Sequence, residues 1–365
     1  MALLEEPNNI DNILLATNTD RDAVITTVKN NADTIFTWDY EKGARPRLNK
    51  LYEKAKGAMW DGETDLDWSL DVDPEEMADH LKVVGTIQNQ PLYDLAQQPG
   101  SPIANWGDTE WSTLAHESLV WQMSQFLHGE QGALVATAKI VETVPWIDAK
   151  YYAATQVMDE ARHVEVFAKY LDTKLQDHYP INPHLQDLLD DVIEDSRWDM
   201  TYLGMQIMIE GLALAAFGFL HQMTEEPLLK KLLRYVMSDE ARHVAFGVLS
   251  LQEVYQDMTA AEIRERQEFA FEAALRMRDR FLRQEVWHKM GVDNPRPLIE
   301  AMLNGPPETK EFQRLLFSKI VPNCRKLGLI DAGDAWLRTK FEEIGVIEFE
   351  HLESTDDEFG DFALN

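Results

Sequence analysis

The sequence has a single cysteine, Cys324, among its 365 residues, so no intrachain disulfide can form. A single thiol also excludes a zinc site built on several thiolates. Basic residues are scarce too, because 34 Lys and Arg face 64 Asp and Glu, giving a formal net charge of −30. This charge repels nucleic-acid phosphates and anionic lipid head groups. We therefore expect no nucleic-acid partner; a basic protein partner or a small uncharged substrate fits better.

The sequence also lacks a recognisable targeting segment. Its first residues, MALLEEPNNIDN, show no basic region followed by an apolar stretch, so we expect no signal peptide and a cytoplasmic protein. One apolar run, Tyr202–Met223, is long enough to cross a membrane. It contains Gln206 and Glu210 near its middle, and the centre of a large bundle also needs a helix that is apolar on nearly all sides. We expect a buried core helix and no membrane span.

Helical periodicity dominates the sequence between Thr109 and Tyr255, where strand signals are few. Breaks fall at Pro145, at HYPINPH and at TEEP, where prolines and polar residues cluster. These breaks separate four predicted helices: Thr109–Glu142, Trp146–Leu175, His184–Met223 and Pro227–Tyr255. Four long helices with short connections predict an all-α bundle, which we place at residues 106–258.

Three further regions flank this predicted core. Residues 1–105 mix short helical patterns with Asp-rich connections, a wrap that Trp38, Trp60 and Trp68 could dock onto the bundle. Residues 259–350 predict additional packing helices: one amphipathic helix over 258–290 and shorter ones near 309–327 and 331–344. Residues 351–365 form an acidic tail that we expect to be loose.

An internal repeat is the most informative pattern in the sequence. The pentapeptide Asp-Glu-Ala-Arg-His begins at Asp159 and again at Asp239, 80 residues later. The same shift places Glu130 over Glu210 without a gap, so each copy has a lone acid 30 residues before its pentapeptide Glu. Each half therefore consists of an acid-bearing helix, a turn and a Glu-x-x-His helix.

Residues three apart share one face of a helix, so Glu160 with His163 and Glu240 with His243 each form a paired ligand set. The lone acids lie among Ala, Leu, Phe and Ile, where an isolated carboxylate must be neutralised, paired or bound to metal. Four carboxylates balance the charge of two divalent cations, and oxygen and imidazole ligands without thiolate favour iron or manganese. A single Glu-x-x-His pair is usually a solvent-exposed polar stripe, but two identical copies with matching acids are not. We predict a dinuclear site with the ligands Glu130, Glu160, His163, Glu210, Glu240 and His243.

The remaining residues of each pentapeptide suggest a supporting layer. A metal-bound imidazole normally donates its other N–H to a carboxylate, which fixes its tautomer. Asp159 and Asp239 flank the ligand helices and could pair crosswise with the His of the opposite copy. Arg162 and Arg242 could then hold those Asp side chains.

This pattern resembles the ferritin-like di-iron carboxylate superfamily, whose members place one acid on each of two helices and Glu-x-x-His on the other two. The match covers roughly Trp121–Tyr255. The fuller Asp-Glu-x-Arg-His form is most similar to the hydroxylase subunits of multicomponent monooxygenases and to the p-aminobenzoate N-oxygenase group. The resemblance implies a ferritin-like four-helix bundle with additional N- and C-terminal helices and with the six residues above as iron ligands.

Several positions depart from the patterns of the subfamilies. Phe167 stands where the ribonucleotide reductase small subunit usually has a radical-forming Tyr, and Leu214 where multicomponent monooxygenases often have Thr. Val236 stands where the N-oxygenase group carries an extra His ligand. Acyl-carrier-protein desaturases have a similar length, but they dock an acidic carrier that this net charge repels. No one subfamily fits at every position.

The resemblance implies an O₂-dependent oxidoreductase that uses two irons, or manganese with iron, to oxidise a small organic substrate. Hydroxylation, N-oxygenation, desaturation and C–C cleavage all stay open, as does the substrate. The expected partners are O₂, an electron donor such as ferredoxin or a reductase, and a second copy in a homodimer. A radical-generating subunit, a non-catalytic iron- or manganese-binding protein, and a metal-free helical scaffold are the alternatives.

Overall fold

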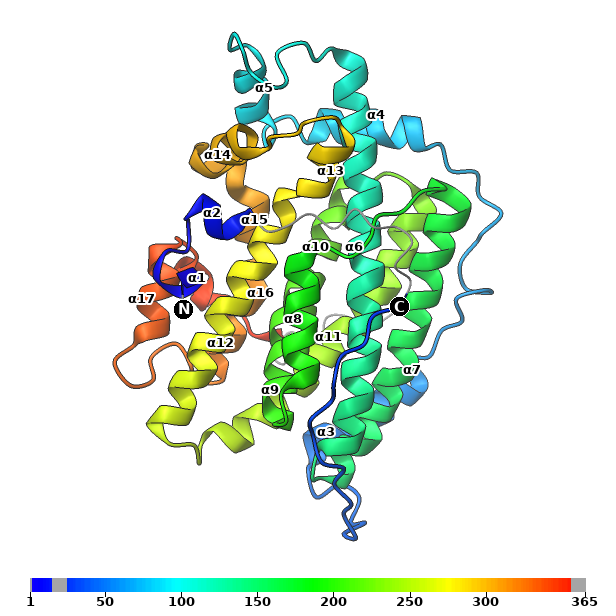
Figure 1. Ribbon diagram of the computed structural model, residues 1–365. Helices are drawn as coiled ribbons and strands as arrows, with labels where there is room; N and C mark the ends of the chain where they lie inside the picture. Colours follow the sequence, from blue (N-terminus) through cyan, green and yellow to red (C-terminus); the bar gives the residue numbers. More distant parts are fainter. Residues whose placement is uncertain (1, 15–24, 356–365) are drawn as a thin grey trace.

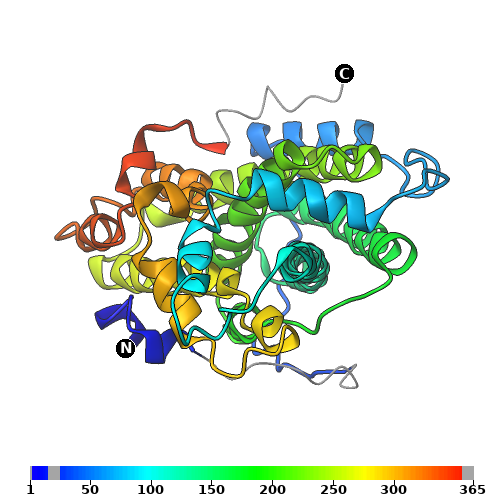
Figure 2. The same ribbon diagram turned by 90° about the horizontal axis from the view of Figure 1, so that it is seen from above.

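The computed structural model describes residues 2–14 and 25–355, and every regular element in this described part is a helix (Figure 1). The predicted all-α architecture is confirmed. Four core segments run side by side: α6 (Asp108–Thr143), α7 (Ile147–Tyr170), the segment from α9 (Trp198–Tyr202) to α10 (Glu210–Met223), and α11 (Pro227–Tyr255). Figure 2 looks along α6 and shows the other helices arranged around it.

Local sequence signals account for the ends of these core helices. Gly107 caps the start of α6, and its N–H donates to the Glu110 side chain at 2.7 Å. The helix stops before Val144, because the residue before a proline disfavours the helical conformation. α11 begins with Pro227 at its first position, and the Glu226 carboxylate accepts from the N–H groups of the first turn.

The single helix expected over His184–Met223 is wrong. The structure divides it into α8 (Pro183–Glu194), α9, a π-helical turn η2 (Leu203–Ile209) and α10. The break falls at residues 195–197, where the Asp195 carboxylate accepts from the backbone N–H of Arg197 at 2.8 Å. Lys139 from α6 donates to the carbonyls of Val192, Ile193 and Asp195 at 3.1, 2.8 and 2.5 Å, which caps the end of α8.

The one amphipathic helix expected over residues 258–290 is also wrong. α12 (Ala260–Asp279) passes into a short 3₁₀ turn, η3 (Arg280–Leu282), and a new helix, α13 (Gln284–Lys289), follows. Arg283 separates them in the left-handed region with φ 54°, which no continuous helix can contain.

The C-terminal helices cover one side of the bundle, as Figure 1 shows for α12, α16 and α17. The shorter helices expected there are present as several pieces. The bounds are α14 Arg296–Asn304, η4 Pro307–Lys310, α15 Glu311–Leu315, α16 Phe317–Lys326, α17 Trp336–Glu343 and η5 Ile347–His351. The expectation of a loose acidic tail falls mostly on residues 356–365, which lie outside the described residues.

The N-terminal region packs on several parts of the molecule: α1 (Ala2–Glu5) lies against α12, and α2 (Ile10–Ile13) and α5 (Gln90–Ala96) lie against α14 (Figure 1). α3 (Pro46–Gly57) packs on α7 and α11, and α4 (Pro74–Val84) packs on α6. Trp60 is buried and Trp68 is partly buried against the core, but Trp38 is 77% exposed and does not dock the wrap. The π turn η1 (Leu171–Leu175) follows α7.

One segment in the described part of the chain, Trp198–Met223, is long and apolar enough to cross a membrane. Its most apolar window is 83% buried inside the protein. In the structure this segment is a core helix of the bundle that packs on α11 and α16.

Candidate metal centre

The six predicted ligands converge from four helices at the middle of the bundle. α6 supplies Glu130, α7 supplies Glu160 and His163, α10 begins with Glu210, and α11 supplies Glu240 and His243. Their exposed fractions are all 5% or less. Two groups of potential ligand atoms form here, each within 4.8 Å: Glu130, Glu160, His163 and Glu240 in one, and Glu160, Glu210 and His243 in the other.

Both imidazoles turn the same nitrogen toward this cluster. His163 Nδ1 lies 3.2 Å from Glu130, 3.4 Å from Glu160 and 3.1 Å from Glu240. His243 Nδ1 lies 3.0 Å from Glu160 and 3.6 Å from Glu240. Glu160 and Glu240 therefore stand between the two imidazoles, where a carboxylate could bridge two ions.

Several atoms in the cluster have no hydrogen-bond partner despite complete burial. They are one oxygen each of Glu160 and Glu210, both oxygens of Glu240, and His243 Nδ1. A buried carboxylate oxygen without a partner is costly, and native proteins rarely leave one unmet. Cations between these oxygens would satisfy all of them, so the donor set fits two metal ions.

The pKa shifts point the same way. Burial, reinforced by Glu240, raises the pKa of Glu130 well above its usual range, and burial with Glu160 does the same for Glu210. Burial lowers the pKa of each imidazole, but the surrounding carboxylates outweigh it and raise the pKa of His163 and of His243. Without metal, the raised pKa values favour protonation of these acids and imidazoles, and the bound protons offset the negative charge of the cluster.

Sequence reasoning did not identify Gln156, one turn before Glu160 on α7. Its Nε2 donates to Glu160 Oε1 at 2.9 Å and to Glu210 Oε1 at 2.8 Å, and its side chain is fully buried. This amide fixes one oxygen of each acid and leaves the other oxygen free. Its spacing four residues before Glu160 was the available signal.

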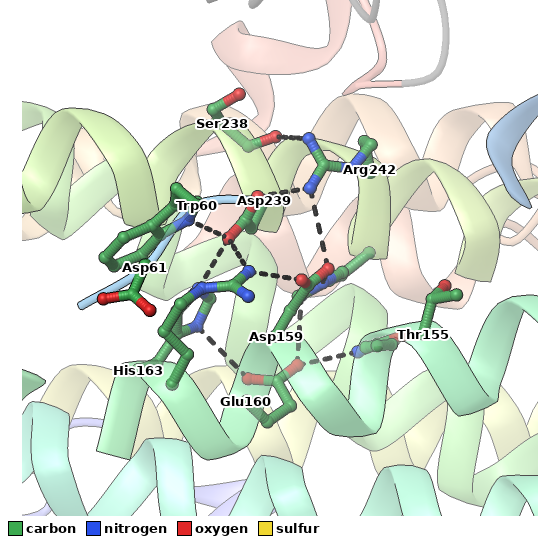
Figure 3. A network of polar contacts seen from close by, with 12 residues as sticks. Trp60, Asp61, Thr155, Asp159, Glu160, His163, Ser238, Asp239 and Arg242 are labelled. Atoms are coloured by element: carbon green, nitrogen blue, oxygen red, sulfur yellow. Dashed lines mark hydrogen bonds and ion pairs between the residues drawn. The ribbon is translucent and has the colours of Figure 1, made fainter. Parts of the chain in front are cut away.

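A supporting layer surrounds the imidazoles, and the two repeats cross in it (Figure 3). His163 Nε2 lies 3.1 Å from Asp239 Oδ2. His243 Nε2 lies 3.3 Å from Asp159 Oδ2. Each Asp thus pairs with the His of the other copy. Burial would raise the pKa of Asp239, but His163 and the nearby guanidinium groups lower it.

Two arginines and one tryptophan hold these aspartates. Arg162 donates to Asp159 and, at 3.0 Å, to Asp239. Arg242 donates to Asp239 and lies 3.6 Å from Asp159. Trp60 Nε1 donates to Asp239 Oδ2 at 2.8 Å, as Figure 3 shows. This role of Trp60 has no signal in the sequence, because it lies 179 residues from Asp239.

The positions that depart from related patterns are buried and apolar. Phe167, Leu214 and Val236 are each at most 2% exposed and offer no ligand atom. Phe167 packs against Phe126 and Phe217, with ring centroids 5.9 and 5.7 Å apart. The side chains at these three positions therefore add nothing to the ligand set.

A cavity of about 20 Å³ adjoins the acids, with Glu130, Glu210 and Glu240 among its lining residues. Arg280 lines it as well and is 3% exposed. Its Nε has no hydrogen-bond partner, and among the described residues no carboxylate pairs with it. Burial lowers the pKa of Arg280 to about 9. No sequence pattern singles out this residue, which lies in η3 directly after α12.

Comparison with known proteins extends these observations. The model of a family described as P-aminobenzoate N-oxygenase AurF matches residues 41–328. No curated protein matches the sequence. Among solved structures, an R2-like ligand-binding oxidase variant with an anaerobically reconstituted Mn/Fe cofactor is 17% identical, with a TM-score of 0.46 over 78% of this chain and 94% of that chain. The same kind of oxidase with an aerobically reconstituted Mn/Fe cofactor is 16% identical, with a TM-score of 0.45 over 75% and 94%.

The matched residues run from before α3 to the end of α16 and include the whole bundle and all six converging residues. The protein is therefore an O₂-dependent di-iron oxidoreductase with a ferritin-like fold, and the chain belongs to the AurF family of p-aminobenzoate N-oxygenases.

Proposed function

We propose that Glu130, Glu160, His163, Glu210, Glu240 and His243 hold two irons and that the chain uses them to oxidise a small organic substrate with O₂. The observation that carries this proposal is the set of buried, unpartnered carboxylate oxygens around two inward-facing imidazoles. When bound, the irons supply the redox chemistry by which O₂ is activated.

The protein's own residues supply geometry, dryness and charge. Asp159 and Asp239 would accept from the Nε2–H groups of the imidazoles, which orients each Nδ1 toward the cluster, where it would serve as the ligand atom once metal is bound. Phe126, Phe167 and Phe217 pack together beside the cluster and exclude water from it. A dry site strengthens the electrostatic interactions made inside it.

N-oxygenation of an aromatic amine with a carboxylate is the reaction we favour. The family description names p-aminobenzoate, which combines both groups. Arg280 supports the proposal. Its guanidinium lines the same small cavity as the acids but pairs with none of them, so it would pair with the carboxylate of a substrate. Val236, in place of an additional His, leaves a six-residue ligand set.

We further propose that a ferredoxin or a reductase delivers the electrons, and that the protein works as a cytoplasmic homodimer. Tyr235, which is partly buried, stacks on Trp60 with centroids 4.9 Å apart. Trp60 in turn bonds to Asp239, the partner of His163. This contiguous path toward the exterior supports an external electron donor.

Iron content tests the ligand assignment. A Glu160→Ala/Glu240→Ala double variant should lose bound iron and O₂-dependent oxidation, because the two acids that lie beside both imidazoles are gone. The matched control is Glu165→Ala/Glu253→Ala, which removes one exposed acid from each of the same two helices. Inductively coupled plasma analysis of both proteins, with circular dichroism to check folding, gives the readout. Stoichiometric iron in the folded double variant would overturn the assignment.

A further inference from the structure

A second, larger cavity lies away from the six acids and imidazoles. It measures about 170 Å³ and is lined by α4, α5, the first half of α6 and the end of α10, and by η3 with Arg283, α14, η4 and α15. Its walls are rich in aromatic rings: Tyr93 and Trp111 have centroids 4.3 Å apart, and Phe281 and Phe312 lie 5.2 Å apart. Such a site suits a ligand with a planar apolar body. We call it the outer cavity.

The charges around the outer cavity contrast with those of the whole chain. Its lining residues, all within the described part of the protein, include the cations Lys82 and Arg283 and no carboxylate, in a chain of net charge −30. Lys82 already pairs with Asp108 at 2.9 Å and with Asp79 at 3.3 Å. Arg283 is therefore the cation available to a ligand.

Arg283 has no acidic partner among the described residues. Its Nε is buried and makes no hydrogen bond, and its guanidinium lies 5.6 Å from the ring of Trp287. Burial lowers the pKa of Arg283 to about 10, so the group is still charged at neutral pH. The Arg283 side chain is partly buried as a whole, and a guanidinium with a buried, unpartnered Nε and no carboxylate beside it favours an anionic partner.

Two more polar atoms at the outer cavity are buried without partners. They are the Ser118 hydroxyl on α6 and the Gln88 carbonyl oxygen Oε1 after α4. The hydroxyl can donate or accept, whereas Oε1 can only accept. Together with Arg283, three polar groups without a hydrogen-bond partner, from three parts of the chain, line the same apolar cavity. Buried polar groups in native proteins are rarely left unmet, so their coincidence indicates a ligand.

The backbone at Arg283 places its side chain here. Its φ of 54° and ψ of 49° lie in the left-handed region, which disfavours residues with a Cβ. The preceding residues continue toward the metal side: Phe281 lines the outer cavity, and Arg280 lines the small cavity beside the acids. α6 contributes in the same order, with Gln122 in the outer cavity and Phe126 in the inner one.

We propose that the outer cavity binds an organic anion with an aromatic body, whose carboxylate pairs with Arg283. The net charge of the chain favoured an uncharged ligand, but an unpaired guanidinium inside an aromatic cavity reverses that preference locally. This site is separate from the metal ligands and from Arg280. It does not depend on the proposed function, since binding should occur in metal-free protein.

Calorimetry on metal-free protein tests the site, with 2-naphthoate as probe and uncharged 2-naphthamide as its matched analogue. 2-Naphthoate should bind one per chain and at least about tenfold more tightly than 2-naphthamide, because only the anion satisfies Arg283. Arg283→Gln should remove that difference. The control Arg264→Gln, a partly exposed arginine already paired with Asp334, should leave it unchanged.

A variant that fills the space keeps the test independent of the lost charge. Ala115→Trp, on the cavity wall, should abolish binding of both probes while Arg283 is intact. Equal affinity for the two probes, or full naphthoate affinity in Arg283→Gln, would overturn the proposal. So would a loss of binding only in Arg280→Gln, which would place the probe in the inner cavity.

The anion could be a substrate on its way to the irons or a separate effector, and one further experiment distinguishes them. Iron-loaded, reduced protein is incubated with 2-naphthoate and O₂, and the probe is recovered for mass spectrometry. An oxidised probe, formed in wild type and lost in Arg283→Gln, supports the site as a substrate entry. An unchanged probe that binds with the Arg283 dependence above supports an effector site. Loss of iron chemistry with intact naphthoate binding would count against the proposed function alone.

Discussion

At the scale of single residues, the supporting layer of Asp159, Asp239, Arg162, Arg242 and Trp60 explains how the imidazoles are held. Asp239 accepts from Trp60, Arg162 and Arg242 while it also faces His163. A carboxylate with this many donors is fixed in place, and it fixes the ring beside it. The contribution of Trp60 can be tested separately from that of the charged residues.

Trp60→Phe should weaken iron binding about 10- to 100-fold, because the variant removes one donor from the aspartate that orients His163. It should also cost about 1.5–3 kcal/mol of unfolding free energy, since the lost bond was made to a charged acceptor. Chelator competition and thermal unfolding would measure the two effects. Trp68→Phe is the matched control, because the Trp68 indole donates to the Gly62 carbonyl and not to an aspartate of the supporting layer. Equal iron affinity in the two variants would contradict the role assigned to Trp60.

The raised pKa values of the ligand residues predict an unusual pH dependence for the metal-free protein. The folded pKa values of Glu130, Glu210, His163 and His243 all lie above their ordinary values. The folded state therefore binds more protons than the unfolded chain, and this contribution to stability falls as pH rises through the folded values.

Metal-free protein should thus melt at a lower temperature at pH 8.5 than at pH 6.5, in thermal scans at constant ionic strength. Iron-loaded protein should show a much weaker trend, because bound cations replace the protons. The reverse order, with metal-free protein more stable at the higher pH, would show that the cluster does not gather protons.

At the scale of helices, glycines set how closely the core segments approach. A Cβ on Gly247 of α11 would lie 2.5 Å from Gln206 Cβ on the π turn η2. The absence of this atom lets η2 lie against α11, so that α10 can begin with Glu210 facing the cluster. Gly218 on α10 has no such neighbour, since the nearest atom to its added Cβ would be Met237 Cε at 3.7 Å.

Gly247→Ala should destabilise the protein by about 1–3 kcal/mol, because the new methyl forces two helices apart. Gly218→Ala should instead stabilise it by about 0.5–1 kcal/mol through the better helix propensity of alanine. Urea unfolding of both variants measures the difference. A Gly247→Ala protein as stable as the Gly218→Ala protein would contradict the close approach of η2 and α11.

The predicted helix ends were accurate where a nearby proline marks them. They were wrong where a residue far away in the sequence determines the break. Pro145 and Pro227 mark real helix ends, so α6, α7 and α11 were predicted within a few residues. The break before α9 depends on Lys139, which reaches α8 carbonyls more than 50 residues away. The apolar pattern of residues 203–209 is equally compatible with an α-helix, so it carries no sign of the π turn.

At the scale of the whole molecule, the sequence predicted which residues would converge but not what surrounds them. Two copies of a spaced motif indicate a symmetric cluster without any knowledge of loops, because helix geometry alone orients Glu and His. Trp60, Gln156, Arg280 and Arg283 carry no comparable pattern. Their roles depend on how the N-terminal wrap and the segment after α12 fold back on the bundle, which is set by tertiary packing.

The crossed pairing of each Asp with the His of the other copy has a consequence for how this protein can change over time. The two halves cannot drift apart independently, because a substitution at Asp159 is felt first at His243, in the opposite half. A half-length ancestor with this motif would have had to form the same pairing between two chains. Fusion of those chains would have turned a contact between two subunits into a contact within one polypeptide. Each half still depends on the other to orient its histidine.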